Sequence, residues 1–313
     1  MQDKFGRQIN YLRLSLTERC TLQCAYCRKD EGCCPKEDEL SAGDFIAITR
    51  AFMNLGINKV RLTGGEPLLR RDLKEIINGI RAIPGLKDLS LTTNAQMLAP
   101  IAAELKTAGL DRVNISLDSL RPEVFKRLTG GDLKRTLAGL QAALEHGLTP
   151  VRLNVVLLQG VNEAEVEDLL ALTKDQPIDV RFIEYMPVGG EADYKGVSNH
   201  TLLAAHPQLV ELKPRYAFQA AREYQIPGHQ GRVGFISAIS DCFCADCNRI
   251  RVLSDGKVRP CLANDAELDL RPALLEEPEA LEKLIREAIL SKPARHHFGS
   301  QNPEVRSMRR IGG

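Results

Sequence analysis

The sequence predicts an α/β fold, an incomplete (β/α)6 barrel followed by a smaller α+β cap. Strand-like apolar runs alternate with amphipathic helical stretches, which is typical of βα units in a parallel sheet. The alternation produces six strands and stops near Pro187. A complete barrel would need eight units and usually about 250 residues. We therefore expect residues 1–187 to form an open barrel and residues 188–313 to form the cap.

The six predicted strands share an apolar character and a length of five to seven residues. They are 11–17, 59–63, 88–93, 112–117, 151–157 and 179–185. The helices between them are predicted at 41–55, 72–82, 99–108, 133–145 and 163–174, the first with Ser41 as its N-cap. Since functional loops of such barrels gather where the strands end, these loops are the first place to look for a site.

The pattern changes after Pro187, where Gly189, Gly190 and Gly196 interrupt it. Short strand-like pieces and one helix follow, at 233–239, 249–253, 257–260 and 278–290. We interpret them as a cap that folds over the barrel mouth.

The nearly equal numbers of basic and acidic residues exclude a strong net electrostatic field that would recruit nucleic acid or an anionic membrane. The chain has 42 basic and 41 acidic residues, so any anion-binding site must be local. It shows no apolar run of about eighteen residues and no charged-then-apolar leader. The expected location is cytoplasmic, where nine cysteines serve as ligands or free thiols rather than disulfides.

Six of the cysteines form two triads, Cys20-x3-Cys24-x2-Cys27 and Cys244-x2-Cys247-x13-Cys261. A closed tetrahedral metal site needs four ligands, and each triad offers three. A cubic iron–sulfur cluster held by three thiolates keeps one iron open to a non-protein ligand. With one triad at the barrel mouth and one in the cap, the two open irons would face each other across one cavity.

Other interpretations of these residues remain. The first triad could form a zinc site with Cys33 or Cys34 as its fourth ligand, although we interpret these two as loop thiols. Cys242 creates a second cysteine spacing, Cys242-x-Cys244-x2-Cys247, and thus competes with Cys244 as a cluster ligand. His296 and His297 suggest a metal, but a polar surface pair is the simpler interpretation.

The first triad, directly after the first strand, resembles the signature of radical S-adenosylmethionine enzymes. In that family the open iron binds S-adenosylmethionine and reduces it, and the cofactor carries the chemistry. The turn 63–67 (Thr-Gly-Gly-Glu-Pro) is similar to the family stretch that contacts the cofactor. The resemblance implies that S-adenosylmethionine is bound by Tyr26, Gly65, Ser116 and Met186. Taken alone, Tyr26 and Met186 would be packing residues and Ser116 a strand-end hydroxyl.

Further motifs at 5–7, 11–15, 91–94, 181–186 and 244–251 resemble the GTP 3′,8-cyclase family of molybdenum-cofactor biosynthesis. The likeness covers nearly the whole chain. It implies a lyase with two 4Fe–4S clusters that converts GTP to 3′,8-cyclo-7,8-dihydro-GTP, the first step of molybdopterin biosynthesis, by way of a 5′-deoxyadenosyl radical that removes the ribose 3′ hydrogen. It also implies a flavodoxin- or ferredoxin-like electron donor and a homodimer.

The same resemblance implies GTP contacts from the strands and catalytic roles in the middle and at the C-terminal end of the cap. The implied GTP ligands are Arg13, Arg61, Thr92, Arg152, Arg249 and Arg251, and the catalytic positions are Arg249, Arg251, Gly312 and Gly313. Guanidinium groups suit phosphate oxygens in number and geometry. Arg13 and Arg61 lie within apolar strands, where an unpaired charge is costly. Two departures from the family pattern are Arg152, where lysine is usual, and Ala95, where glycine is usual. The spacing of the resembled family favours Cys244 over Cys242 as a cluster ligand.

Two other functions fit parts of the pattern. A peptide-modifying radical enzyme would also carry clusters in its extension, with more cysteines and a carboxylate-rich cleft. A two-cluster electron carrier would need neither the barrel nor the Gly-Gly-Glu-Pro turn.

Overall fold

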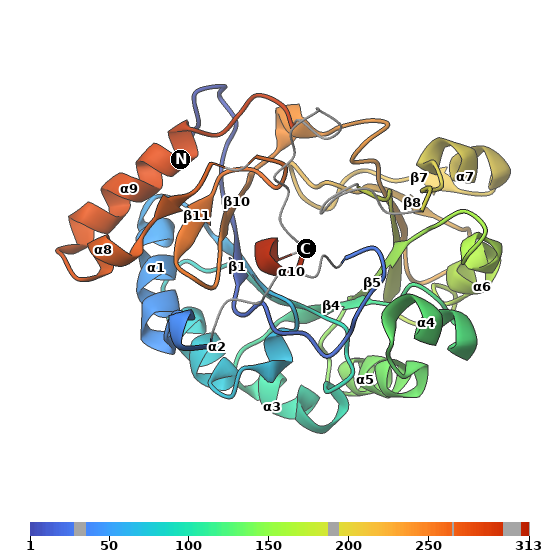
Figure 1. Ribbon diagram of the computed structural model, residues 1–313. Coiled ribbons are helices and arrows are strands. Elements are labelled where there is room, and N and C mark those ends of the chain that lie inside the picture. Colours follow the sequence, from blue (N-terminus) through green and yellow to red (C-terminus); the bar gives the residue numbers. More distant parts are fainter. Residues whose placement is uncertain (28–35, 187–193, 265, 297–307, 313) are drawn as a thin grey trace.

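The computed structural model describes residues 1–27, 36–186, 194–264, 266–296 and 308–312, and it confirms the predicted barrel. Six strands run parallel, each paired with the next in the chain. They are β1 (Tyr11–Ser15), β2 (Lys59–Thr63), β3 (Asp88–Thr93), β4 (Arg112–Ser116), β5 (Val151–Val156) and β6 (Ile178–Ile183). Figure 1 shows them as a curved wall with helices around its outside.

Five helices occupy the predicted connections, namely α1 (Ala42–Asn54), α2 (Leu73–Arg81), α3 (Ala102–Thr107), α5 (Leu133–Glu145) and α6 (Val166–Ala171). Ser41 caps α1, as expected, and forms a capping box with Asp44. Short 3-10 turns precede two of these helices, η3 (Ala99–Ile101) before α3 and η4 (Glu163–Glu165) before α6. A sixth helix, α4 (Pro122–Thr129), was not predicted; it ends at Gly130, whose φ of 71° provides a left-handed C-cap.

The strands after residue 187 join the barrel sheet. β9 (Val233–Ile236) pairs in parallel with β6, and β10 (Arg249–Val252) pairs in parallel with β1. The sheet order is β12-β11-β10-β1-β2-β3-β4-β5-β6-β9-β8-β7. The wall therefore has eight parallel strands, six from the predicted barrel and one at each edge from the later part of the chain.

Most of the remaining elements of the later part lie around these two edges. They are α7 (Asn199–Ala205), β7 (Val210–Glu211), β8 (Arg222–Gln225), β11 (Lys257–Arg259), β12 (Leu268–Asp269), α8 (Arg271–Leu274) and α9 (Pro278–Leu290). The last helix, α10 (Met308–Ile311), lies inside the ring of strands (Figure 1). β11 pairs with β10 in antiparallel fashion, as β8 does with β9. The division of the chain at residue 187 stays a prediction.

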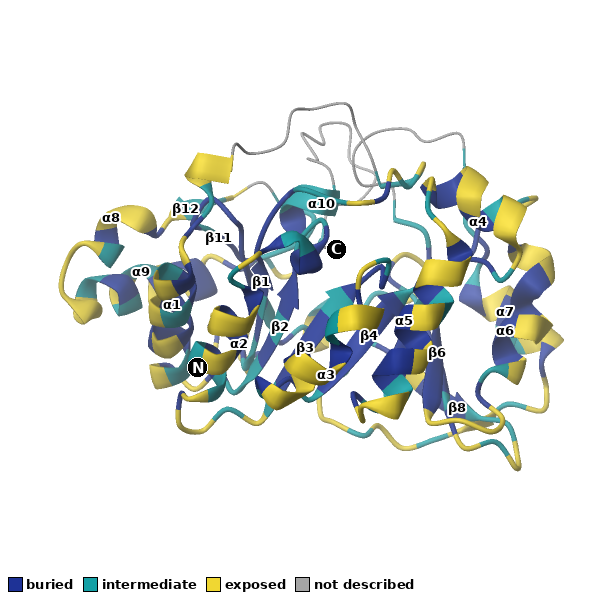
Figure 2. Cartoon of the chain, turned by 90° about the horizontal axis from the view of Figure 1, so that it is seen from below, coloured by how far each residue is buried: buried dark blue, intermediate teal, exposed yellow. Residues whose placement is uncertain are grey.

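The two faces of the barrel wall differ in polarity. Leu12, Leu14, Val60 and Leu62 are fully buried on the outer face, where they pack in the hydrophobic core. Figure 2 shows the strands dark blue between helices whose outer faces are yellow. Because side chains alternate along a strand, the residues between these apolar ones point into the barrel. That interior position is where the arginines of the strands lie. In the described part of the chain, no helix is both long and apolar enough to cross a membrane.

Candidate functional site

The first cysteine triad lies on the loop that follows β1. The amide of Leu22 donates to Cys20 Sγ at 3.4 Å, and the amide of Cys27 donates to the carbonyl of Cys24 at 3.0 Å. All three thiols are half-buried. Burial, followed by the charges of neighbouring groups that include the other two thiols, raises the pKa of Cys24. Burial and Cys20 raise the pKa of Cys27 to about 11. Three thiols of one loop thus share one small space, as a ligand set for a cluster requires.

The Gly-Gly-Glu-Pro turn is fixed against this loop by backbone contacts. The amide of Gly65 donates to Thr17 O at 2.7 Å, and that of Glu66 donates to Arg19 O at 2.7 Å. A Cβ at position 65 would lie 2.3 Å from Arg19 O. Only glycine permits this approach, so the turn after β2 and the cysteine loop are held together as one unit.

Glu66 connects that unit to the end of β3. Its buried carboxylate accepts hydrogen bonds from Leu68 N at 3.1 Å, Thr93 Oγ1 at 2.8 Å and Asn94 N at 2.8 Å. The Asn94 side chain in turn donates to Cys20 Sγ at 3.7 Å. Burial raises the pKa of Glu66 to about 7 despite these donors.

The residues predicted to bind S-adenosylmethionine lie at the carboxyl ends of several strands. Tyr26 follows Cys24, and its hydroxyl donates to Asp118 Oδ2 at 2.5 Å. Ser116 ends β4, two residues before Asp118. Burial raises the pKa of Asp118 to about 6. Met186 follows β6 and lines both cavities described next.

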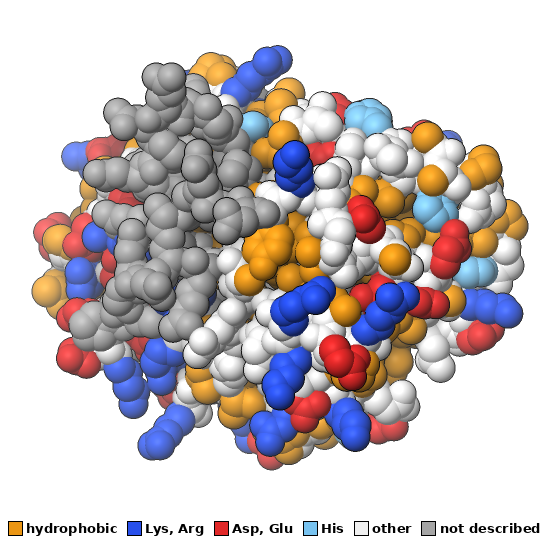
Figure 3. All heavy atoms as spheres, turned by 45° about the vertical axis from the view of Figure 1, so that its right-hand side comes forward, with side chains coloured by type: hydrophobic (Ala, Val, Ile, Leu, Met, Phe, Trp, Pro, Cys, Tyr) orange, Lys and Arg blue, Asp and Glu red, His pale blue; other side chains and the backbone are white. Residues whose placement is uncertain are grey.

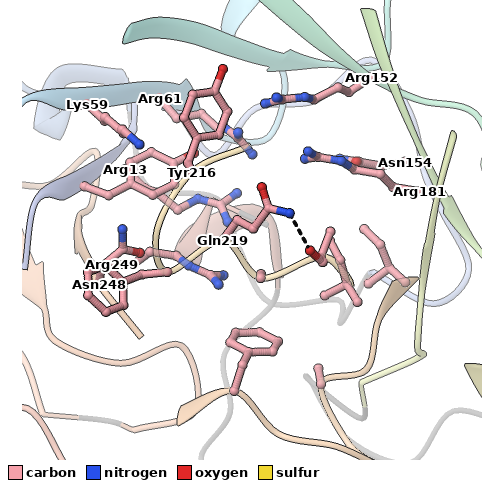
Figure 4. A pocket seen from close by; sticks show the side chains of 18 of the residues that line it. Arg13, Lys59, Arg61, Arg152, Asn154, Arg181, Tyr216, Gln219, Asn248 and Arg249 are labelled. Atoms are coloured by element: carbon pink, nitrogen blue, oxygen red, sulfur yellow. Dashed lines mark hydrogen bonds between the residues drawn. The ribbon is translucent and has the colours of Figure 1, made fainter. Parts of the chain in front are cut away.

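A cavity of about 180 Å³ fills the barrel interior. Figure 4 shows guanidinium groups that enter it from the surrounding strands. Its described lining has eight basic side chains and one carboxylate, that of Asp88. The basic residues are Arg13, Lys59, Arg61, Arg112, Arg152, Arg181, Arg249 and Arg251.

Strand register explains this concentration of positive charge. Arg13 on β1 lies directly beside Arg61 on β2 and Arg251 on β10. Burial, and then the charge of Arg251, lowers the pKa of Arg13 to about 9. Burial likewise lowers the pKa of Arg61 to about 9. Like charges held together out of water are costly unless an anion joins them.

Several guanidinium nitrogens of the cavity have no hydrogen-bond partner among the described residues. They include Arg152 Nη2, Arg181 Nε and Arg249 Nη2, all buried. Burial lowers the pKa of Arg152 and that of Arg181. On the face shown in Figure 3, by contrast, blue and red side chains are interspersed. The concentrated positive charge of the cavity thus contrasts with the mixed charge of this face, in agreement with the balanced composition.

One end of the cavity is lined by a segment that the sequence analysis missed, residues 216–221. The Tyr216 ring lies 4.4 Å from Lys59 Nζ and 6.0 Å from the guanidinium of Arg152. Arg215 anchors this segment through two hydrogen bonds to Asp179, at 2.6 and 3.0 Å. Arg152 Nε is 3.7 Å from the same carboxylate.

The second cysteine triad lines an adjoining cavity of about 80 Å³, together with Cys242. This cavity shares part of its wall with the larger one, namely Met186, Ala238, Phe243, Arg249, Arg251 and Leu262. Although burial opposes it, the positive charges of Arg249 and Lys292 lower the pKa of Cys247 to about 7. A group bound by these thiols would thus face the cationic cavity across Arg249 and Arg251.

Lys292 and the guanidinium of Arg249 shape the wall between the cavities. The buried Lys292 ammonium donates to Arg249 O at 2.8 Å and to Pro260 O at 2.7 Å. It thus ties β10 to the segment that carries Cys261. The guanidinium of Arg249 lies 4.7 Å from the Phe243 ring, a cation–π contact that directs it along the shared wall.

The last described residues enter the barrel mouth, and Figure 1 shows α10 inside the ring of strands, near the centre of the molecule. Arg251 Nη1 donates to Gly312 O at 2.8 Å and to Ile311 O at 3.2 Å. Gly312 has a φ of 71°, and a Cβ there would lie 2.3 Å from Thr63 Oγ1 and 3.1 Å from Ser15 Cβ. Arg310 pairs with Glu18 at 3.3 Å and with Asp255 at 3.0 Å. The tail is thus fitted into the mouth rather than frayed.

Some predicted residues lie elsewhere or beyond description. Thr92 accepts a hydrogen bond from Asn114 at 3.4 Å and does not line either cavity in the described structure. Cys33, Cys34, His297 and Gly313 lie outside the described residues. His296, interpreted as half of a polar surface pair with His297, is half-buried and lines the second cavity.

Sequence reasoning also missed cavity residues that a simple signal would have found. Lys59 and Arg112 each lie two positions from a polar residue of the same strand, Arg61 and Asn114 respectively. This period of two places all four on the inner face. Applied to β6, the same period assigns Arg181 to the interior.

Comparisons with known proteins agree with this site. The pattern of the Radical SAM superfamily matches residues 14–173, and that of Molybdenum Cofactor Synthesis C matches residues 178–298. The GTP 3′,8-cyclases of Alkaliphilus oremlandii (strain OhILAs) and Alkaliphilus metalliredigens (strain QYMF) are 44% and 46% identical, each over the whole of both chains. Among solved structures, Streptococcus suis SuiB has the same fold, with a TM-score of 0.66 at 17% identity over 93% of this chain and 68% of that one. This chain therefore belongs to the radical SAM superfamily and, within it, to the GTP 3′,8-cyclase family.

Proposed function

We propose that this chain converts GTP to 3′,8-cyclo-7,8-dihydro-GTP, as a radical S-adenosylmethionine enzyme with two 4Fe–4S clusters. The observation that carries the proposal is the shared wall between the two cavities. A pocket lined by eight basic side chains opens onto a pocket lined by the second cysteine triad. A nucleotide whose phosphates lie in the basic pocket and whose base reaches a cluster in the cysteine-lined pocket would fit both pockets.

The barrel arginines hold the triphosphate. Arg13, Arg61 and Arg152 all line the same cavity, and buried nitrogens of Arg152 and Arg181 have no hydrogen-bond partner among the described residues. Phosphate oxygens would supply those acceptors and offset the mutual repulsion of the guanidinium groups. The nucleotide is thereby oriented with its base toward Arg249, Arg251 and the second triad.

The donor sets fit the two clusters. Cys20, Cys24 and Cys27 would hold the first, and Cys244, Cys247 and Cys261 would hold the second. When bound, the first cluster and S-adenosylmethionine supply the radical chemistry, and the protein supplies position and shielding. Tyr26, Gly65, Ser116 and Met186 lie on the same side of the barrel as the first triad and are the proposed S-adenosylmethionine contacts.

The protein also excludes water from the reacting atoms. The C-terminal turn closes the mouth from one side through Arg251, and Tyr216 covers the opposite end of the cavity. Arg249 and Arg251 face both cavities, so they position the base and counter negative charge on it. Thr92 is still proposed as a GTP contact. It would act indirectly, through Asn114, which donates a hydrogen bond to it.

Finer properties are proposed on the same basis. The reaction forms a carbon–carbon bond without hydrolysis or net transfer between substrates, which supports the lyase class. Free, half-buried thiols in both triads support a reducing, cytoplasmic location, since thiols there stay reduced. A flavodoxin- or ferredoxin-like electron donor, a homodimer and a boundary at residue 187 complete the proposal.

Peptide modification is the second candidate. The barrel is shared with SuiB, but at 17% identity that likeness concerns the fold alone. One carboxylate against eight basic groups in the described cavity lining favours a polyphosphate over a peptide.

The proposal is tested by anaerobic turnover of the reconstituted protein with GTP, S-adenosylmethionine and dithionite. We expect 5′-deoxyadenosine and the cyclised nucleotide in equal amounts, with both GTP binding and cyclisation lost in Arg249→Ala. Formation of 5′-deoxyadenosine without a cyclised nucleotide would overturn the substrate assignment.

A further inference from the structure

A second set of metal-ligating side chains overlaps the second triad. Potential ligand atoms of Cys242, Cys244 and His296 all lie within 4.8 Å of one another. All three residues are half-buried, and all line the smaller cavity. Neither Cys247 nor Cys261 belongs to this closer set.

The spacing of the set suits one ion better than one cube. Zinc–sulfur bonds of about 2.3 Å in a tetrahedron place neighbouring ligand atoms about 3.8 Å apart. Because the three ligand atoms already lie within 4.8 Å of one another, a small adjustment of the side chains brings them to this distance. Thiolates on a cubic cluster stand farther apart, because each binds a different iron atom.

The chemical types of the three ligand atoms also favour a zinc-type ion. Two thiolates and an imidazole are the preferred ligands of zinc. His296 Nε2 lies 3.0 Å from Ala238 O, and since a carbonyl only accepts, Nε2 carries the proton. The lone pair of the neutral ring is then on Nδ1. A backbone carbonyl that orients a ligand histidine in this way is the usual support of a metal site.

We propose that the cluster-free chain binds a single zinc-type ion through Cys242, Cys244 and His296, with a fourth position open to water. Because Cys244 also belongs to the triad of the second cluster, the ion and the cluster exclude each other. The site holds the cap segment 242–244 against the segment around His296 before the cluster is assembled, and zinc delays that assembly.

The test uses Co²⁺ as a spectroscopic probe of the full-length, cluster-free chain. Cys20, Cys24 and Cys27 are replaced by serine in this background, so that the first triad cannot bind the probe. We expect one equivalent of Co²⁺ to give thiolate charge-transfer absorption and tetrahedral d–d bands, which one equivalent of Zn²⁺ removes.

Matched variants in that background assign the ligands. Cys242→Ser should lower Co²⁺ affinity at least tenfold and reduce the charge-transfer intensity, and His296→Ala should do the same to affinity. Cys261→Ser should leave both unchanged. Absorption that persists in Cys242→Ser but disappears in Cys261→Ser would overturn the proposal, as would absence of tetrahedral Co²⁺ in the parent. Far-UV circular dichroism of each variant confirms that it is folded.

Competition with the cluster is measured on the chain with all nine cysteines. One equivalent of Zn²⁺ per second site, added before iron and sulfide, should slow assembly of the second cluster several-fold, read from its absorption and iron content. In Cys242→Ser the same zinc should have little effect, while iron content without zinc equals that of the parent. Equal zinc inhibition in both proteins would overturn the proposal, because zinc would then act without Cys242.

Discussion

Arg251 donates a hydrogen bond from Nη1 to the carbonyl oxygen of Gly312 at 2.8 Å. This contact joins β10, which follows Cys244 and Cys247, to the last described turn of the chain. Gly312 packs in turn against Thr63 and Ser15, at the ends of β2 and β1. Both cysteine-bearing regions and the tail therefore meet at one point of the barrel mouth.

Gly312→Ala should displace the tail. A Cβ at this position would lie 2.3 Å from Thr63 Oγ1, so the turn must move and break the Arg251 contact. A hydrogen bond to a charged group contributes about 1.5 kcal/mol or more, so we expect cyclisation to slow at least roughly tenfold. Gly147→Ala is the control, with a φ of 68° and nothing within 4 Å of the added Cβ. Equal rates in the two variants would show that tail placement is irrelevant.

Removal of Gly312 and Gly313 should abolish cyclisation while both clusters still assemble. In the proposed function the cysteines hold the clusters, whereas Gly312 contributes only backbone to the mouth. Iron and sulfide analysis, together with a product assay, separates the two effects. Unchanged cyclisation by the shortened chain would show that the terminus has no role.

Arg152→Ala should weaken GTP binding about ten- to hundredfold, because it removes a buried guanidinium with an Nη2 that has no described partner. Arg152→Lys keeps the charge but loses the fork, so a smaller loss is expected. Arg222→Ala is the matched control, since that side chain is 63% exposed and pairs with Asp241 on the surface. Isothermal titration with GTP measures all three. The assignment fails if the two alanine variants bind GTP equally.

Glu66 should make the free energy of unfolding depend on pH. Burial raises its pKa from 4.5 to about 7, so between these values the folded chain keeps a proton that the unfolded chain has released. Stability contributed by Glu66 is therefore complete below about pH 4.5 and lost as pH rises through 7, by about 3 kcal/mol in all. Urea unfolding of the cluster-free parent and of Glu66→Gln at pH 5 and pH 7.5 tests this. Parallel pH profiles would contradict it.

The sequence predicts the barrel well because the apolar runs of its strands and the amphipathic repeat of its helices are easy to tell apart. β2, β3 and α5 have the predicted bounds, and the other four strands of the predicted barrel differ by at most two residues at an end. The missed helix α4 begins at Pro122 and is only eight residues long, too short for its periodicity to separate it from a loop.

What the sequence does not reveal is pairing between distant segments. The strand 249–252 was predicted as part of the cap, yet it lies beside β1, where Arg251 meets Arg13. Likewise, nothing local in Tyr216 or His296 indicates that the first covers Lys59 or that the second approaches Cys244. Such contacts depend on tertiary packing.

The most direct test of the two-cluster site is electron paramagnetic resonance of the dithionite-reduced protein, with and without each ligand. The account predicts two cluster signals, one changed by S-adenosylmethionine and the other by GTP. In Cys247→Ala the GTP-sensitive signal should be lost and the other kept. A single cluster signal, or one signal that responds to both ligands while the other responds to neither, would contradict it.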